Sequence, residues 1–231
     1  MEGLLLIDKP ILWTSHDVVD AVRRRAGLRQ VGHAGTLDPM ATGLLILLVG
    51  RATKAFSSFE AHDKEYEGML TLGLRTDTLD LEGRIVSTSD PSAVDAAQAR
   101  SAFSSTVGRI EQPVPHYSSA RVKGAKAYEL ARKNVSFEPP VKTVEIKSLE
   151  LLRMESPDVW FSTVVSKGTY VRSLCDEIGR KLGCGAVLSA LRRLRSGPFL
   201  VRDSVPVEAL SRMRAPEIAA RLLPVGSVKA S

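Results

Sequence analysis

An apolar run at residues 44–49, LLILLV, directly follows a segment of glycine and other small residues, GHAGTLDPMATG at residues 32–43. The run has the length and composition of a buried strand. The segment before it has little side-chain surface to bury, which favours a loop, and its glycines permit close backbone approach or positive φ. Pro39 biases Asp38 away from the right-handed helical region. The pattern therefore places one carboxylate, Asp38, on a loop at the entrance to buried structure.

Apolar periodicity along the rest of the chain predicts both strands and helices. The other expected strands lie at residues 3–9, 64–74, 84–87, 143–154 and 159–166. Helices are expected at residues 15–26, 53–61, 91–104, 125–133 and 170–182, with Asp90 and Thr169 as caps of the third and the last, and two short helical pieces at 205–223. Because strands and helices interleave without regular βαβ spacing, the predicted class is α+β, with a large mixed or antiparallel sheet flanked by helices.

The composition is that of an ordinary globular protein. The 231 residues, 44% hydrophobic and 25% charged, can bury one substantial core. No apolar stretch reaches the length of a membrane span, and Glu2 without a basic flank is not typical of a signal peptide, so a cytoplasmic location is expected. Cys175 and Cys184 and the four histidines show no metal-ligand spacing, so neither a metal nor a disulfide is expected.

Basic residues outnumber acidic ones by 32 to 26, and their distribution is more informative than the net charge of +6. Three clusters stand out, at residues 23–25, at 121–126 and at 192–195. Any one of them could be a solvated face, but three in a basic chain predict a partner with a phosphate backbone.

Several motifs in order resemble the TruB family of bacterial tRNA pseudouridine synthases. The segment around Asp38 is similar to the family's GHTGTLDP-type motif. The other matching segments are IDKP at residues 7–10 with TSHDVV at 14–19, KEYEG at 64–68 with TDT at 76–78, YELAR at 128–132, SKGTYVRSL at 166–174 and LRRL at 191–194. The match runs from about residue 3 to residue 224.

The resemblance implies the pseudouridine synthase fold, with the active site in a central cleft across the sheet. It implies that Asp38 is the catalytic nucleophile, since a carboxylate can form a covalent intermediate with a sugar carbon or a pyrimidine ring. Attack at C1′, attack on the ring and initial removal of a sugar proton all remain open. Arg172 would keep Asp38 ionised, because a nearby cation lowers the pKa of a carboxyl group by roughly 1–3 units. Tyr66 would stack on the target base and take part in proton transfer.

Further residues are assigned to RNA by the same resemblance. His33 would fill the space of a flipped nucleotide, since a base inside a folded loop must be extruded to react. Tyr170 and Leu191 would pack around the base, and Lys9 and Arg121 would contact phosphates. The chain departs from the family pattern beside these positions, with Leu12 where glycine is usual, Ala34 where threonine is common and Val114 in place of a proline.

The implied function is isomerisation of uridine to pseudouridine at position 55 in the T-loop of tRNA, by a monomer that needs no cofactor. The chain has neither a Walker loop nor a dinucleotide fingerprint, which agrees. The predicted organisation is a single catalytic domain, residues 1–231, without the small RNA-binding PUA domain that usually follows in this family. Two alternatives are a tRNA-binding or folding protein with secondary or lost catalysis, and a hydrolase or phosphatase built on Asp38 or on the turn at residues 77–80.

Overall fold

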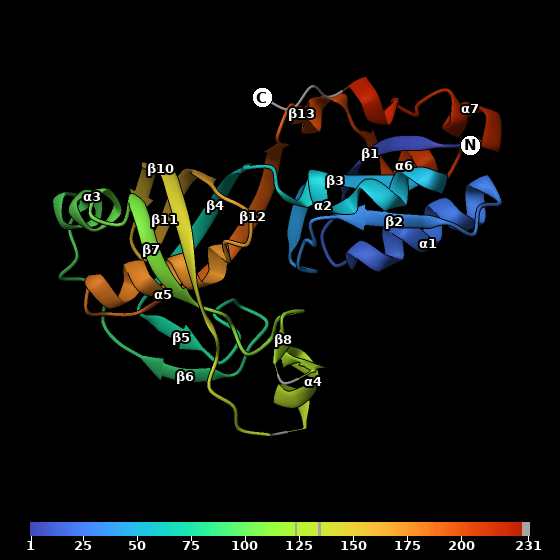
Figure 1. Ribbon diagram of the computed structural model, residues 1–231. Coiled ribbons are helices and arrows are strands. Elements are labelled where there is room, and N and C mark those ends of the chain that lie inside the picture. Colours follow the sequence, from blue (N-terminus) through green and yellow to red (C-terminus); the bar gives the residue numbers. More distant parts are fainter. Residues whose placement is uncertain (123, 134, 228–231) are drawn as a thin grey trace. The chain divides into compact units, whose positions relative to one another are not determined.

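The computed structural model describes residues 1–122, 124–133 and 135–227, and the chain divides into two compact units (Figure 1). We call residues 1–66 together with 191–227 the terminal unit, and residues 67–190 the central unit. The two boundaries fall inside strands β4 (Lys64–Leu72) and β12 (Ala186–Ser196). In the described part of the chain, no helix is long and apolar enough to cross a membrane.

The terminal unit is built on a mixed sheet in the order β14-β1-β3-β12. Its strands besides β12 are β1 (Gly3–Lys9), β2 (Val31–Ala34), β3 (Ala41–Val49), β13 (Phe199–Leu200) and β14 (Val205–Pro206). Strand β3 runs antiparallel to β1 and β2 and parallel to β12, while β13 pairs with β12. The apolar run at residues 44–49 is buried along its whole length, which is why this strand occupies the middle of the sheet.

Helix α1 (Ser15–Ala26) covers β2, and its two ends follow directly from the sequence. Thr14 and Asp17 form a reciprocal capping box at its start, and Gly27 ends it in the left-handed conformation. Helices α6 (Val207–Leu210) and α7 (Ala215–Ala219) pack against α1. The remaining helical pieces of this unit are η1 (Gly50–Ala55), α2 (Phe56–Glu60), η2 (Val201–Asp203) and η3 (Val225–Ser227).

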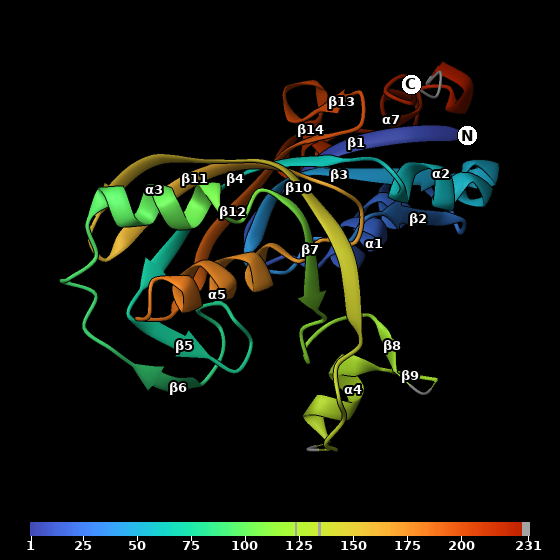
Figure 2. The same cartoon turned by 60° about the vertical axis from the view of Figure 1, so that its left-hand side comes forward.

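The central unit continues with strands in the order β12-β4-β11-β10-β7 (Figure 2). Its main strands are β7 (Gly108–Pro113) and the hairpin of β10 (Val141–Glu155) and β11 (Asp158–Val165). Two small sheets, β5 (Leu74–Thr76) with β6 (Ile85–Thr88) and β8 (Arg121–Val122) with β9 (Ala125–Lys126), complete it. Helix α3 (Ala96–Ser104) packs against β10 and α5 (Val171–Lys181), and α4 (Ala127–Arg132) follows β9.

These observations confirm the predicted α+β class with a large mixed sheet, and they correct several boundaries. The helix expected at residues 125–133 begins at Ala127 after the short strand β9, and the one expected at 53–61 is η1 followed by α2. Helix α3 begins at Ala96 with Asp95 as its cap, because Asp90 instead binds Ser92 in the preceding turn. Helix α5 starts after Tyr170, since the Thr169 hydroxyl donates back to the Ser166 carbonyl. The strand expected at residues 64–74 is interrupted at Gly73, whose φ is +80°.

Leu12 occupies a backbone conformation that suits glycine. Its φ is +68°, its side chain is 75% exposed, and its amide donates to the Pro39 carbonyl at 2.9 Å. A non-glycine residue in the left-handed conformation costs about 1–2 kcal/mol of stability. Glycine removes this strain, but it offsets about 0.5–1 kcal/mol of the gain because its unfolded chain has more conformational freedom. Leu12→Gly should therefore raise the melting temperature by about 1–4 °C. Leu12→Ala is the control in thermal unfolding, because it keeps the strained Cβ; equal melting temperatures for the two variants would contradict the assignment of strain.

Candidate active site

The loop that carries Asp38 is shorter than the sequence indicates. Gly32 and His33 belong to β2, and residues 41–43 belong to β3, so only residues 35–40 connect the two strands. The hairpin register places His33 opposite Leu47. Backbone pairing thus extends into the segment expected as loop, because its small residues fit a strand next to the buried β3 as well as they fit a turn. Asp38 is half-buried near the tip of this connection.

Neighbouring groups hold several polar backbone atoms around Asp38. The Asp38 carbonyl accepts from the Ala41 amide at 3.0 Å, and the Ser15 hydroxyl bonds both the amide and the carbonyl of Leu37, at 2.9 and 3.0 Å. The Pro39 carbonyl accepts from Lys9 at 3.2 Å as well as from the Leu12 amide. A loop fixed in this way holds its side chain in one geometry before substrate arrives, as a catalytic group requires.

The structure corrects the role expected for Lys9. Its side chain is fully buried, and its ammonium donates to the carbonyls of Pro10, Trp13 and Pro39 at 2.9, 2.6 and 3.2 Å. The expectation of a phosphate contact does not fit a buried ammonium with three carbonyl partners. Lys9 instead ties the start of the β1–α1 connection to the Asp38 loop.

His33 lies half-buried near the side chains of Arg193 and His16. Burial, followed by the charges of Arg193 and His16, holds the pKa of His33 below its ordinary value of 6.5. Its Nδ1 is buried and has no hydrogen-bond partner among the described residues. The neutral imidazole is therefore the favoured form near neutral pH, which suits a ring that packs against an uncharged base.

The lowered pKa of His33 predicts how stability depends on pH. At pH values between the pKa of His33 in the folded protein and 6.5, the unfolded chain binds more protons than the folded one. The contribution of His33 to the free energy of unfolding is therefore complete above pH 6.5 and is lost as the pH falls from 6.5 to the folded-state pKa. His33→Gln should reduce the drop in melting temperature between pH 7.5 and pH 5. The drop that remains includes the contribution of His62, because burial also lowers the pKa of that residue. NMR titration of wild type should place the His33 midpoint below 6.5; a midpoint above 6.5 would contradict this account.

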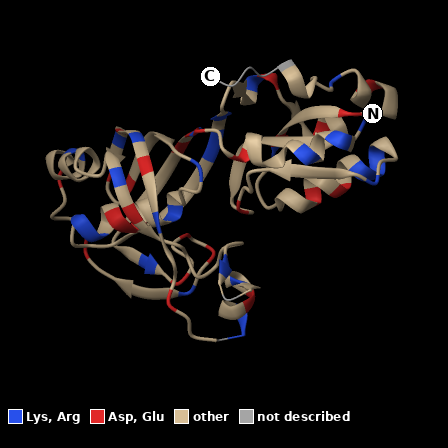
Figure 3. Cartoon of the chain, viewed as in Figure 1, with Lys and Arg blue, Asp and Glu red and all other residues tan. Residues whose placement is uncertain are grey.

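The third basic cluster is not a solvated face. Arg193 is 1% exposed, Arg192 makes two bonds to Asp8 at 3.0 and 2.7 Å, and Arg195 pairs with Glu65 at 2.7 Å. The expectation of a phosphate footprint at residues 192–195 is therefore corrected, because one of its charges is buried and the other two are paired with carboxylates. Figure 3 marks the basic residues of the chain in blue.

The other two basic clusters include exposed side chains. On α1, Arg24 and Arg25 are exposed, whereas Arg23 bonds Asp20 and the Val31 carbonyl. Arg121 is exposed at the start of β8, and Lys123 of the same cluster lies outside the described residues. Because these arginines are exposed, both clusters remain available to contact a phosphate backbone.

In the central unit, Arg172 is buried at the first turn of α5. Its guanidinium donates to the carbonyls of Thr78 and Tyr117 at 2.7 and 2.9 Å and lies 3.5 Å from the Asp80 carboxylate. Both side chains of this ion pair are 5% exposed. Such a network fixes the position and direction of Arg172.

Asp80 completes this network. It accepts hydrogen bonds from the Thr78 hydroxyl and, at 3.1 Å, from the Glu82 amide. The TDTLD pattern at residues 76–80 is a turn signal whose first three residues also match a family motif, and the hydrolase alternative placed a catalytic site on this turn. The structure pairs Asp77 with Arg84 and Asp80 with Arg172, and no acidic or histidine cluster in the described chain could hold a metal.

Gln112 holds the backbone of Tyr170. The Gln112 amide group donates to the Tyr170 carbonyl at 3.1 Å and accepts from the Tyr170 amide at 2.8 Å, which anchors the start of α5. Lys142 lies 5.9 Å from the centre of the Tyr170 ring. In the terminal unit, Tyr66 is 7% exposed on β4, and the Leu191 carbonyl accepts from the Thr42 hydroxyl at 3.3 Å.

The chain matches two family models that together cover almost all of it. Residues 23–171 match the TruB family pseudouridylate synthase N-terminal domain, and residues 172–228 match the tRNA pseudouridylate synthase B C-terminal domain. The chain belongs to the TruB family of pseudouridylate synthases. Membership in the TruB family makes it an isomerase, as the sequence predicted.

Relatives in the TruB family share much of the sequence. The tRNA pseudouridine synthase B of Syntrophotalea carbinolica is 48% identical over 96% of this chain and 72% of the relative. The protein of the same name from Opitutus terrae is 42% identical over 97% of this chain and 93% of the relative.

Among solved structures, the archaeal box H/ACA sRNP Nop10–Cbf5 complex contains a similar chain, with 27% identity and a TM-score of 0.70 over 96% of this chain. An H/ACA RNP bound to a substrate RNA containing 2′-deoxyuridine gives 28% identity and a TM-score of 0.67 over 89% of this chain. The chain spans 60% and 51% of these two chains. The likeness supports the pseudouridine synthase fold for this TruB family member.

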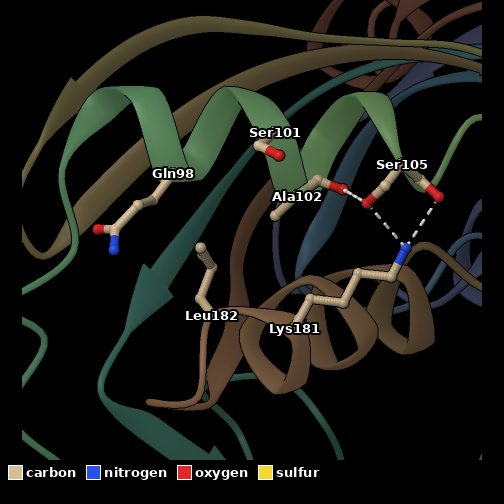
Figure 4. A pocket seen from close by; sticks show the side chains of 6 residues that line it. All are labelled: Gln98, Ser101, Ala102, Ser105, Lys181 and Leu182. Carbon is tan, nitrogen blue, oxygen red and sulfur yellow. Dashed lines mark hydrogen bonds between the residues drawn. The ribbon is translucent and has the colours of Figure 1, made fainter.

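A pocket in the central unit lies away from these residues. It is a depression of about 550 Å³ between α3 and α5, lined by Gln98, Ser101, Ala102, Ser105, Lys181 and Leu182 (Figure 4). The Lys181 ammonium is held by Ser105 and Thr106, which joins the two helices. None of the site residues expected for the TruB family lines it, so we assign it a packing role.

Proposed function

We propose that this chain isomerises uridine to pseudouridine at position 55 in the T-loop of tRNA, with Asp38 as the nucleophile. The observation that carries the proposal is the anchored loop around Asp38, in a chain whose relatives bear the name tRNA pseudouridine synthase B. The partner is tRNA, bound at its T-arm and elbow by a cytoplasmic monomer. The reaction requires neither a metal nor a cofactor.

The reaction rearranges bonds within one nucleotide. The bond between N1 of uracil and C1′ of ribose breaks, the base rotates, and a bond between C5 and C1′ forms. The proton on C5 leaves and N1 gains one, so atoms balance without an oxidant or a reductant. Asp38 contributes by a covalent step at C1′, by a covalent step at the ring, or by removing a sugar proton, and each of these needs the carboxylate ionised.

Arg172 is the charge partner of Asp38 in this proposal. A cation beside a carboxylate favours its ionised form. The geometry of the central unit supports this role, because two backbone carbonyls and the Asp80 carboxylate hold Arg172 in place. A guanidinium with a fixed direction stabilises charge without reorganising during the reaction.

The remaining residues bind the RNA in this proposal. Tyr66 stacks on the target uracil and takes part in the proton transfer, while Tyr170 and Leu191 pack around it. His33, whose pKa is lowered by its burial and by the charge of Arg193, fills the space of the extruded nucleotide. Arg121 contacts phosphate, which agrees with its exposure.

A T-arm stem-loop RNA tests the proposal. Incubation with the protein followed by nucleoside analysis should show one pseudouridine per hairpin, located at position 55. The matched control hairpin carries cytidine at that position and should yield none. Tight binding of the hairpin without any pseudouridine would favour the folding-protein alternative, and pseudouridine at other uridines would contradict the assigned target.

A further inference from the structure

Arg193 is a buried cation next to the Asp38 loop that the proposed mechanism does not use. It lies on β12, is 1% exposed, and is among the largest fully buried side chains of the chain. Within residues 1–122, 124–133 and 135–227, no carboxylate forms an ion pair with it. Burying a guanidinium without a counter-ion is costly, so its retention needs a specific reason.

The hydrogen bonds of Arg193 reach both ends of the segment that carries Asp38. Its Nε donates to the Leu44 carbonyl at 2.6 Å, and a terminal nitrogen donates to the Gly35 carbonyl at 3.0 Å. Gly35 begins the connection between β2 and β3, and Leu44 is the fourth residue of β3, the strand that follows the connection. One rigid planar group therefore joins the first residue of the loop to the strand after it.

The glycines of the loop allow this close approach. Gly43 is paired with Arg193 across the parallel strands, and a Cβ on Gly43 would lie 2.3 Å from the Arg193 carbonyl oxygen. A Cβ on Gly35 would lie 3.5 Å from the guanidinium. Both glycines have positive φ, of +100° and +83°, so their carbonyls and neighbours take directions that other residues reach only with strain.

We propose that Arg193 is a positioning residue for the nucleophile: its guanidinium clamps Gly35 and Leu44 and so fixes the Asp38 loop between them. The inference rests on the proposed function, because it concerns the geometry of that reaction. Lys9 and Ser15 hold the middle of the same loop, at Pro39 and Leu37, while Arg193 bonds the first residue of the loop and the strand that follows it. A displacement of about 1 Å in a reacting group can lower a rate about 100-fold.

Two substitutions of Arg193 test the clamp through the rate. Arg193→Met removes both bonds and should lower the single-turnover rate at saturating enzyme on the order of 100-fold. Arg193→Lys keeps the charge but cannot bridge both carbonyls, so its rate should lie between those of Met and wild type. The Kd for tRNA should stay within about threefold, because phosphate contacts dominate affinity. Arg202→Met is the control, since it removes the same charge from an exposed position on η2.

Arg193→Met could be slower because the protein is less stable rather than because Asp38 is misplaced, so a second control is needed. Val205→Ala removes buried volume from β14 in the same unit without touching the loop. At a temperature where all variants are folded, Val205→Ala should keep the wild-type rate. Rates for Arg193→Met and Val205→Ala that agree would overturn the proposal.

Hydrogen exchange gives a readout that does not depend on activity. The amides of Leu37 and Ala41 are bonded within the anchored loop, and they should exchange at least tenfold faster in Arg193→Met than in Val205→Ala. The pKa of His33, which burial and then the charge of Arg193 lower, should rise in Arg193→Met and stay low in Arg193→Lys. Unchanged exchange would overturn the clamp even with an active enzyme, whereas a wild type that makes no pseudouridine would overturn the proposed function alone.

Discussion

Asp38→Asn protein should lose pseudouridine formation by a factor of about 10⁴ or more, while binding tRNA with a Kd within about threefold of wild type. The amide is nearly the same size as the carboxylate but cannot act as a nucleophile or a base. The loop that positions residue 38 is held through its backbone and through Ser15 and Lys9, so it should keep its shape in the variant.

The matched control for this substitution is Asp203→Asn, which removes one negative charge from an exposed residue of the same unit. Rates should be compared in single turnover with enzyme in excess, so that binding does not limit them. An active Asp38→Asn protein would remove Asp38 from the chemistry. A variant that no longer bound tRNA would instead show that the residue contributes to affinity.

Arg172→Met should produce the largest loss of stability among the single substitutions considered. It leaves the Asp80 carboxylate buried without its cation and removes the donor from the carbonyls of Thr78 and Tyr117. Breaking one side of a buried ion pair costs about 3–5 kcal/mol, which for a chain of this length lowers the melting temperature by about 10 °C. Urea unfolding should show the loss as a lower midpoint with an unchanged slope.

Two comparisons separate the buried pair from charge in general. Arg172→Met with Asp80→Asn should recover part of the loss, because no unpaired charge then remains buried. Arg75→Met breaks a surface ion pair with Asp176 and should cost at most about 1 kcal/mol. Equal losses for Arg172→Met and Arg75→Met would contradict the role given to the buried network. At a temperature where it is folded, Arg172→Met should also be slower than Arg75→Met.

Local sequence signals predicted much of the fold. Strand β1 and helix α1 begin and end at the predicted residues, since an unbroken apolar run and a capping box with a glycine stop are set within a few residues. The hairpin of β10 and β11 was found in the same way. Two of the boundaries that differed, at α3 and α5, depended on which of several polar residues cap the backbone, and neighbouring tertiary contacts decide that.

The support of the candidate site could not be read from the sequence. Lys9 and Arg193 look like surface cations, yet both are buried because backbone carbonyls distant in the sequence accept their hydrogen bonds. Asp80 looks like a turn residue, and only the fold shows that Arg172 lies beside it. Composition and periodicity carry no information about such long-range pairs. The catalytic role of Asp38 comes from the motif and stays a prediction.

Release of tritium from tRNA labelled with [5-³H]uridine tests the central claim most directly, because only a reaction at C5 frees that label. Wild-type protein should release close to one equivalent of tritium per tRNA, and the tRNA should then contain pseudouridine at position 55. Asp38→Asn should release none, while Asp203→Asn should match wild type. A wild-type protein that binds tRNA and releases no tritium would contradict the account.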